Sequence, residues 1–538
     1  MQQPTGRARQ RRTGGSRAVR VGLGASWTAA ASMALLGVVS GPAPARAQVG
    51  PGLASAETPQ GTMPGPVQPP NAATNPFGGP GSQVVADDNI TATEQQALQQ
   101  AQQGVLDPTA AQQLLGKLVL YDRNLSPNRQ QACVSCHTHE AGFTGGLSSI
   151  NASLMSYSGA LFYRWGQRKP QGYSYAPFAP VLHYDAAAGQ FFGGNFWDER
   201  ATGEITGNPS GDQAMQPLID PLEMELPDPA CVAYRIASGP YRAFFQRVWG
   251  FASLAINWPA NAEALCSQPQ SVEAANPTLP GFDENNPPTV LTLSAADRAL
   301  ATQAWHNTGL SAAAHEAGPD VSPFSSKFDR ALKGQATLTA QEQQGYALFT
   351  GQGHCSQCHS ASGSQPLFTN WGTANLGVPK NTGNVFYTET QPDQYGFVPN
   401  PSGAGYVDPG LGGYLASPSD IHPDWHALAP NFVGRFQIAT LRNVAKVPFP
   451  GFVKDYMHNG YFKSLKDVVH FYNTRDVLPT CPTDMQDSVA SLGNQQCWSA
   501  PEQPRNVNRT QIGNLGLSSS DEDAIVAFLD TLSDGYTP

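Results

Sequence analysis

The sequence is short of charged residues and has few long apolar runs. Only 13% of its 538 residues are charged, while Gly and Pro number 54 and 46. A wholly disordered chain would need more charge and fewer apolar residues, and a collagen would need a strict glycine repeat. The 40% of hydrophobic residues can fill two or three domain-sized cores. We therefore expect a loop-rich globular protein.

Acidic residues are absent from the first 47 positions, which carry seven arginines. An apolar stretch and then the small-residue triplet Ala45-Arg46-Ala47 follow this basic start, which is the order of a secretory signal peptide. An uncleaved membrane anchor is the alternative, but Gly, Ser and Thr dilute the stretch and no second one follows. We predict cleavage after Ala47 and an exported, periplasmic protein.

Cleavage there would leave a strongly acidic chain, with 24 basic and 41 acidic residues. Such a charge balance argues against nucleic acid as a partner. Residues 48–90 have almost no charge and no apolar periodicity, which is typical of a flexible linker. We expect two domains after it, over residues 91–335 and 336–538.

Apolar residues recur at helical spacing in several segments. The spacing predicts helices in TATEQQALQQAQQ and DPTAAQQLLGKLVLYD before the first cysteine pair, and in LTAQEQQGYALF before the second. This similarity is a weak internal repeat. Two further helices are predicted in SLKDVVHFYN and, after capping Ser and Asp residues, in SSSDEDAIVAFLDTL.

Two cysteine pairs share both their spacing and a following histidine. Residues 133–137 read CVSCH and residues 355–359 read CSQCH, the signature of covalent c-type haem attachment. Cysteines three apart lie on one side of a helical turn and can each form a thioether, while the histidine reaches the iron. A redox disulfide needs no histidine after both pairs, and a zinc ribbon needs the pairs about 15–20 residues apart. The predicted cofactors are two covalent c-type haems, bound by Cys133, Cys136 and His137 and by Cys355, Cys358 and His359.

Four cysteines remain outside these pairs. In an exported protein an even remainder indicates two disulfides, and the simplest pairing joins Cys231 to Cys266 and Cys481 to Cys497. Free buried thiols are the alternative.

Eight segments between about residues 110 and 535 follow one another in an order typical of a known family. They read LGKLVLYDRNLS with ACVSCH, NFWDERA, QPLIDPLEM, SKFDRALKG, GYALFTGQGHCSQCH, TLRNVA, YMHNGYF and LSSSDEDAIVAFL. In these segments the chain resembles the bacterial di-haem cytochrome c peroxidases and their MauG-type relatives. The resemblance implies a mainly α fold, in which two cytochrome c-like haem domains face each other and carry long Gly/Pro-rich loops such as 361–432.

The resemblance also implies catalytic residues. Trp197 matches the tryptophan that relays electrons between the haems, and Gln213 and Glu223 match the distal pair above the peroxide-binding haem at His137. Heterolytic cleavage of an O–O bond needs a group that takes a proton from one oxygen and delivers it to the other, which a desolvated carboxyl can do. Without the resemblance, Trp197 would be interpreted as a core aromatic and Glu223 as a solvated surface residue.

The sixth ligand of the first haem is predicted to be missing. Classical peroxidases of this family carry a histidine 16 positions after the first proximal one, and Ser153 stands at that place here. His139 is too close to His137 to reach the opposite face of the haem, and His183 is the alternative ligand. We expect an open distal side at His137, as in the MauG-like members.

For the second haem, the resemblance points to tyrosine ligation. The peroxidases place a methionine 14 residues after the histidine of the YxHxG-type segment, and counting from His458 arrives at Tyr472. A phenolate stabilises Fe(III) and higher oxidation states, whereas a thioether favours Fe(II). Met457 is the alternative iron ligand.

Some family features are absent. MauG-type enzymes use a tryptophan two residues before the second cysteine pair to oxidise a docked protein, and that position is Gly353. The family also binds Ca²⁺ between the domains, but Tyr175 or Lys169 stands where its liganding asparagine would fall. A bound Ca²⁺ is left open.

The leading hypothesis is a periplasmic di-haem oxidoreductase that reduces hydrogen peroxide and takes electrons from a small cytochrome c or cupredoxin. A MauG-like enzyme that oxidises side chains of a partner protein is the first alternative. A non-enzymatic two-haem electron carrier and a di-haem oxygenase are the others. The resemblance also leaves open a homodimer.

Overall fold

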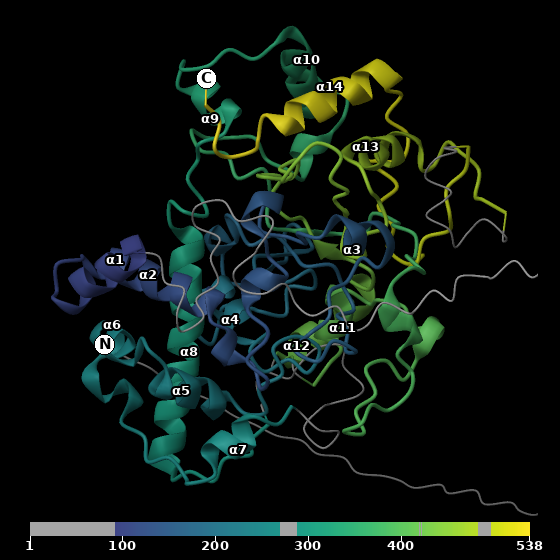
Figure 1. Cartoon of the computed structure of the whole chain (residues 1–538). Coiled ribbons are helices and arrows are strands. Elements are labelled where there is room, and N and C mark those ends of the chain that lie inside the picture. The colour runs from purple at the N-terminus through teal and green to yellow at the C-terminus, as the bar shows by residue number, and fades with distance from the viewer. Residues whose placement is uncertain (1–91, 270–287, 419, 421, 483–495, 538) are drawn as a thin grey trace, which may run out of the picture. The chain divides into compact units, whose positions relative to one another are not determined.

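Helices form most of the regular structure of the chain in the computed structural model, which describes residues 92–269, 288–418, 420, 422–482 and 496–537 (Figure 1). The α-helices of these residues are α1 (Ala92–Gln102), α2 (Pro108–Tyr121), α3 (Ser148–Ser153), α4 (Pro209–Met215), α5 (Pro229–Ser238), α6 (Arg242–Trp249), α7 (Ala262–Cys266), α8 (Ala295–Ala317), α9 (Lys327–Leu332), α10 (Ala340–Thr350), α11 (Leu411–Leu415), α12 (Pro423–His426), α13 (Leu465–Thr474) and α14 (Ser519–Asp530). The predicted mainly α class is confirmed. The predicted signal peptide (1–47) and linker (48–90) lie outside the described residues.

Strands are few and short. β1 (His183–Asp185) pairs antiparallel with β2 (Gln190–Phe192), with Tyr184 opposite Phe191. β3 (Thr373–Ala374) pairs antiparallel with β4 (Phe436–Gln437). These two small sheets connect loop segments and form no core of their own, because each has only two strands.

The helices that the apolar spacing predicts are all present, as α1, α2, α10, α13 and α14. The capping prediction for α14 is also confirmed, since the Ser518 side chain accepts a hydrogen bond from the Asp521 N–H and the Asp521 side chain bonds back to the Ser518 N–H. Such a capping box satisfies two N–H groups that the helix itself leaves without partners.

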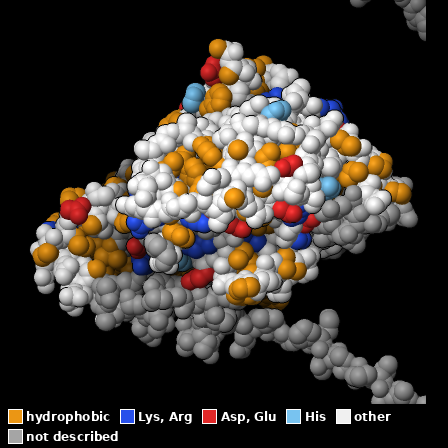
Figure 2. Space-filling model, turned by 90° about the horizontal axis from the view of Figure 1, so that it is seen from above, with side chains coloured by type: hydrophobic (Ala, Val, Ile, Leu, Met, Phe, Trp, Pro, Cys, Tyr) orange, Lys and Arg blue, Asp and Glu red, His pale blue; other side chains and the backbone are white. Residues whose placement is uncertain are grey.

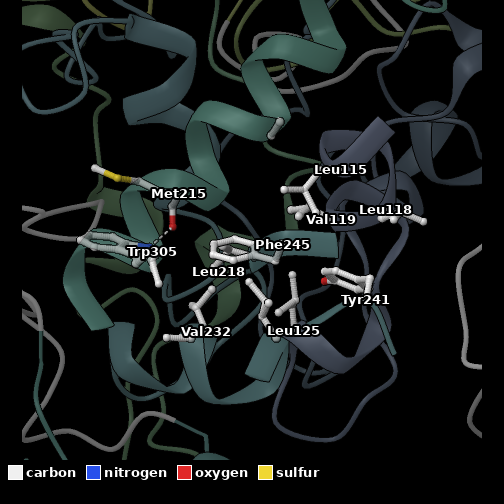
Figure 3. Packing of buried hydrophobic residues seen from close by; sticks show 14 of the residues in the cluster. Leu115, Leu118, Val119, Leu125, Met215, Leu218, Val232, Tyr241, Phe245 and Trp305 are labelled. Carbon is white, nitrogen blue, oxygen red and sulfur yellow. Dashed lines mark hydrogen bonds between the residues drawn. The ribbon is translucent and has the colours of Figure 1, made fainter. Parts of the chain in front are cut away.

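The larger hydrophobic core surrounds α8. Helices α2, α4 and α5 all pack against it, and its Trp305 donates its indole N–H to the Met215 carbonyl at 2.8 Å (Figures 1 and 3). Figure 3 shows Leu115 and Val119 of α2 on one side of Phe245 of α6, and Val232 of α5 on another. A Cβ at Gly116 of α2 would collide with the Ser311 carbonyl of α8, so this crossing requires a glycine.

A second, smaller core lies between α10, α13 and α14. Its buried members include Phe349, Val469, Ile525 and Phe528. A Cβ at Gly345 of α10 would collide with the Ala524 carbonyl of α14, which repeats the glycine-dependent crossing of the first core. The bounds predicted for the two domains, and the way that the domains face each other, stay predictions.

Two disulfides link the four remaining cysteines. Cys231 bonds to Cys266, which joins α5 to α7, and Cys481 bonds to Cys497. The simplest pairing is therefore confirmed. The cysteines of the two Cys-x-x-Cys-His segments are all free thiols.

One face of the described chain carries mixed charge. Figure 2 shows acidic and basic side chains close together among many uncharged ones, on the face seen from the α10 and α14 end. Over the described ranges, no helix is both long enough and apolar enough to cross a membrane.

Candidate functional site

The predicted residues of the first haem site meet in one cavity of about 150 Å³, here called the His137 cavity. Cys133 begins a short 3₁₀ helix, Cys133–Ser135, and Cys136 follows it just ahead of His137. A first 3₁₀ turn, Arg123–Leu125, separates this helix from α2. The lining residues that the sequence predicted are Cys133, Cys136, His137, Trp197, Gln213 and Glu223.

The imidazole of His137 is prepared to bind a metal. Its Nδ1 donates to the Phe143 carbonyl at 3.0 Å, and because a carbonyl only accepts, the lone pair is on Nε2. Desolvation lowers the pKa of His137 to about 4, so the ring is neutral at pH 7.

Glu223 lies in the loop after α4 and is held by its backbone. Its carbonyl accepts from the Ala160 N–H at 2.6 Å and its own N–H donates to the Asp220 carbonyl at 3.1 Å. Desolvation, and then the negative charge of Asp220, raise the pKa of Glu223 to about 8, against an opposing effect of Arg200. A carboxyl whose pKa lies close to neutral pH can both take up and release a proton.

The predicted residues of the second haem site line a larger cavity of about 240 Å³, here called the His359 cavity. His359 follows a second short 3₁₀ helix, Cys355–Gln357, and its Nδ1 donates to the Phe368 carbonyl at 2.9 Å. Desolvation lowers the pKa of His359 to about 4. Both histidines therefore share one arrangement, a neutral ring whose Nδ1 donates to a phenylalanine carbonyl.

Both candidates for the sixth ligand of the second haem line the His359 cavity. The Tyr472 hydroxyl of α13 lies 4.0 Å from the Met457 sulfur. Burial raises the pKa of Tyr472, so the phenol is neutral until a cation comes close. Met457 has a φ of 67°, a left-handed conformation that is uncommon for a residue with a side chain of this size. The choice between Tyr472 and Met457 stays a prediction.

Trp197 lines both cavities. Its indole N–H donates to the Lys169 carbonyl at 3.1 Å, and its own carbonyl accepts from the Gln437 N–H of β4 at 2.8 Å. The aromatic ring is thus fixed from both sides at a position that touches both candidate haem sites.

The other histidines considered from the sequence lie elsewhere. His139 and His183 are exposed, and His183 Nδ1 bonds to the Val181 carbonyl at 2.9 Å. Ser153 is exposed too, and its hydroxyl donates to the Ser149 carbonyl at 2.7 Å. Within the described ranges, the His137 cavity is lined by no second histidine.

At the two positions considered for Ca²⁺, polar donors are engaged. The buried Lys169 ammonium donates to Thr144 Oγ1 at 2.9 Å, and the Tyr175 hydroxyl donates to Asp534 at 2.8 Å. In the described part of the chain, no group of three or more His, Cys, Asp or Glu side chains is arranged to hold a metal ion. The Ca²⁺ site stays a prediction.

Several charged residues of the His137 cavity escape sequence reasoning, namely Arg168, Lys169, Arg200, Asp220 and Glu316. Desolvation raises the pKa of Glu316, on α8, to about 8. Arg200 carried a signal, because it stands in the same NFWDERA segment as Trp197. Glu316 carried none, since nothing in its local sequence separates it from a surface carboxylate.

Known proteins resemble the chain in sequence and in fold. The family model described as di-haem cytochrome c peroxidase matches residues 110–337. The methylamine utilization protein MauG of Paracoccus denitrificans is 31% identical over 427 residues, which cover 78% of this chain and 88% of that protein. The cytochrome-c peroxidase IdrP2 of Denitromonas iodatirespirans is 29% identical over 212 residues, or 38% of this chain and 43% of that protein.

A solved structure shares the fold. The diheme peroxidase BthA of Burkholderia thailandensis aligns with a TM-score of 0.54 at 24% identity, over 80% of this chain and 89% of that one. The family supports two haems, and the two cavities each offer two free thiols and a neutral imidazole. The chain belongs to the di-haem cytochrome c peroxidase and MauG family of peroxidase-type oxidoreductases.

Proposed function

We propose that the protein is an exported di-haem c-type oxidoreductase that reduces hydrogen peroxide in the His137 cavity and exchanges electrons through the His359 cavity. The observation that carries the proposal is the meeting of Cys133, His137, Gln213 and Glu223 in one cavity, with Trp197 shared between that cavity and the next. The roles of these residues are inferred from their chemistry and from the family resemblance.

The two cavities suit covalently bound haem. The thiols of Cys133 and Cys136, and those of Cys355 and Cys358, are free to form thioethers. Haem supplies the iron that binds peroxide and accepts electrons. His137 and His359 would bind iron through Nε2, and the carbonyls on Nδ1 would hold each ring in place.

On the peroxide side, Glu223 and Gln213 divide the work. The carboxylate of Glu223 takes a proton from one oxygen of hydrogen peroxide and gives it to the other oxygen, which leaves as water. The Gln213 amide, on α4, orients the peroxide by hydrogen bonding. The raised pKa of Glu223, about 8, keeps both of its protonation states accessible near neutral pH.

On the electron side, one observation supports a small electron-donor protein over a docked protein substrate. A Cβ at Gly353 would lie 2.9 Å from the Leu348 carbonyl, 3.3 Å from the Cys355 sulfur and 3.4 Å from the Ile525 side chain. The position where MauG-type members carry a tryptophan therefore has no room for a large ring. We favour electron delivery by a small cytochrome c or cupredoxin over oxidation of a docked protein.

A spectroscopic titration tests the proposal. The oxidised holoprotein is followed by EPR and optical spectroscopy before and after one equivalent of hydrogen peroxide, and then with a reduced small c-type cytochrome. We expect a high-spin haem at rest, reaction within seconds and catalytic oxidation of the cytochrome. His183→Gln is the control, because this exposed side chain lines neither cavity.

Other outcomes decide against parts of the proposal. Two low-spin haems that ignore peroxide until one electron is added would overturn the open site at His137. Reaction with peroxide but no turnover of the cytochrome would favour the MauG-like alternative. No reaction in either state would overturn peroxide reduction itself.

Export is proposed from the amino-terminal sequence alone. Residues 1–47 are expected to be absent from the mature protein, which would begin at Gln48. Amino-terminal sequencing of protein from the periplasmic fraction checks this, and an intact Met1 on membrane-bound material would support the anchor alternative.

A further inference from the structure

A chain of buried ion pairs runs from the His137 cavity to the His359 cavity. Arg168 and Arg200 line the first cavity and Asp408 lines the second, while Asp198 lies between the two arginines. The side chains of Asp198, Arg168 and Asp408 are less than one tenth exposed.

The contacts along this chain are short. Asp198 accepts from Arg200 Nη1 at 3.0 Å, and its other oxygen lies 2.7 Å from Arg168 Nη1. Arg168 in turn donates from Nε and Nη2 to the two oxygens of Asp408, at 2.7 Å each. Two-point pairing of this kind fixes the planes of both groups.

The end of the chain that matters for catalysis is Arg200. Its guanidinium stacks over the Phe196 ring at 3.7 Å and shares the His137 cavity with Glu223 and Asp220. Its positive charge favours the carboxylate form of Glu223, because opposite charges stabilise each other strongly where water is excluded.

We propose that Asp198 is a positioning residue that acts through Arg200: it balances the charge of this arginine, and the two residues together set the proton affinity of Glu223. The inference rests on the proposed role of Glu223 as the group that moves the proton of peroxide. It adds the means by which the protein tunes that group, which the family resemblance does not assign.

Charge balance gives the direction of each effect. Desolvation alone would raise the pKa of Asp198, but Arg168 and Arg200 lower it to about 2, so this carboxylate is negative over the whole working range. Removing its charge leaves Arg200 less compensated and lowers the pKa of Glu223. Removing the charge of Arg200 does the opposite.

The other charged groups around the cavity are the same in every variant compared, and Glu316 titrates in the same pH range as Glu223 in all of them. Asp220 is on the same loop as Glu223, Arg168 and Lys169 come from the segment before Tyr173, and Glu316 comes from α8. The remaining titratable groups are the Cys133 and Cys136 thiols, the His137 imidazole and the Tyr157 and Tyr173 phenols.

The test is a pair of substitutions with opposite signs. In the holoprotein, the carboxyl stretch of protonated Glu223 is followed by infrared difference spectroscopy against pH, and Glu223→Gln identifies the band. The rate of the peroxide reaction is measured over the same range. It is expected to rise as pH increases through about 8, because only the carboxylate can accept the proton.

We expect Asp198→Asn to shift both midpoints down by about one pH unit and Arg200→Gln to shift both up by about one unit. Asp198→Glu, which keeps the charge, should restore most of the original midpoint. Arg435→Gln is the matched control, because this arginine also stacks on a phenylalanine, Phe432, but lines neither cavity.

The outcomes separate the inference from the function on which it rests. The inference alone is overturned if Asp198→Asn and Arg200→Gln shift the two midpoints in the same direction. It is also overturned if neither variant shifts them, while Glu223→Gln abolishes both the carboxyl band and the rise of the peroxide rate with pH. If the rise of the peroxide rate with pH persists in Glu223→Gln, Glu223 is not the group that moves the proton, and the inference is overturned together with that role. If Asp198→Asn does not retain haem, the midpoints of Arg200→Gln and Asp198→Glu still test the inference. The first should be raised and the second should stay near the parent value.

Discussion

The two cavities are alike on one side and differ on the other. Each takes its thiols from a short 3₁₀ helix that follows an α-helix, and each has a histidine whose Nδ1 donates to a phenylalanine carbonyl. Each preceding helix, α2 or α10, also crosses a later helix at a glycine. The part of each cavity that would bind iron through histidine therefore has the same local structure in both.

The other lining residues of the two cavities carry different chemistry. The His137 cavity has Glu223, Gln213 and the ion pairs of Arg200. The His359 cavity also has charged residues, such as Asp408, but it adds Tyr472 and Met457. A wall of acid, amide and guanidinium groups can move a proton and stabilise charge on a small ligand. A wall that offers a phenol or a thioether can instead fill the sixth position of an iron. Under the proposed function, the repeated residues would bind the cofactor and the residues that differ would give each haem its own role.

The largest expected effect removes one cavity's cofactor at a time. Changing Cys133 and Cys136 to Ala should leave a protein with one covalent haem, and so should changing Cys355 and Cys358 to Ala, because thioether formation needs the thiols. Intact-mass measurement of the denatured protein counts the haems. The Cys231→Ala/Cys266→Ala variant is the control and should keep both. Two covalent haems in either thiol variant would contradict c-type attachment at that pair.

The second effect concerns the wall of the His137 cavity. Glu223→Gln should lower the rate of the peroxide reaction about 10²–10⁴-fold, since an amide cannot accept the proton. Stopped-flow absorbance of the oxidised holoprotein measures this rate. Glu316→Gln, which changes another carboxyl of the same cavity, should cost less than about tenfold, because general acid–base catalysis depends on position as well as proton affinity. Equal losses would mean that the cavity has no single proton-transfer group.

The third effect concerns the wall of the His359 cavity. Tyr472→Phe should raise the midpoint potential of the second haem by on the order of 0.1 V or more, out of the roughly 0.8 V that axial ligands span. Loss of an anionic donor favours Fe(II), and Met457, whose sulfur lies 4.0 Å from the tyrosine hydroxyl, could take the place. Redox titration checks this, with Met457→Leu expected to stay near the parent value. The reverse result would identify Met457 as the ligand.

The helices show where sequence reasoning succeeds. Helices α2, α10, α13 and α14 are amphipathic or capped, and their apolar spacing predicts them. The longest helix, α8, was not predicted, because its buried face is made largely of Ala, Gly, Ser, Thr and Asn. Small side chains there let α2 and α4 approach closely, at Ser311 and Gly309, and they leave no apolar period to detect.

The site divides in the same way. The residues proposed to bind haem could be named from the sequence because Cys-x-x-Cys-His is a local pattern with a fixed geometry. The ion pairs could not, because Arg168 and Asp408 are 240 positions apart and only the fold brings them together. A charged residue carries no mark in the sequence of the partner that it will meet. Buried charges that are paired across the fold are thus the part of this site that needs a structure.

The smallest expected difference compares the two disulfides, one of which lies in the α8 core. In the chain-entropy account, a closed loop stabilises more the longer it is, and the sequence separations here are 35 for Cys231–Cys266 and 16 for Cys481–Cys497. Removing them as paired Cys→Ala changes should cost about 4 and about 3 kcal/mol of unfolding free energy. Guanidinium unfolding followed by circular dichroism measures both. Cys231 and Cys266 are also fully buried, which adds lost packing to the first variant. A larger loss for Cys481–Cys497 would mean that this bridge stabilises folded structure in the second half by more than loop closure, and that the two halves are held together by different means.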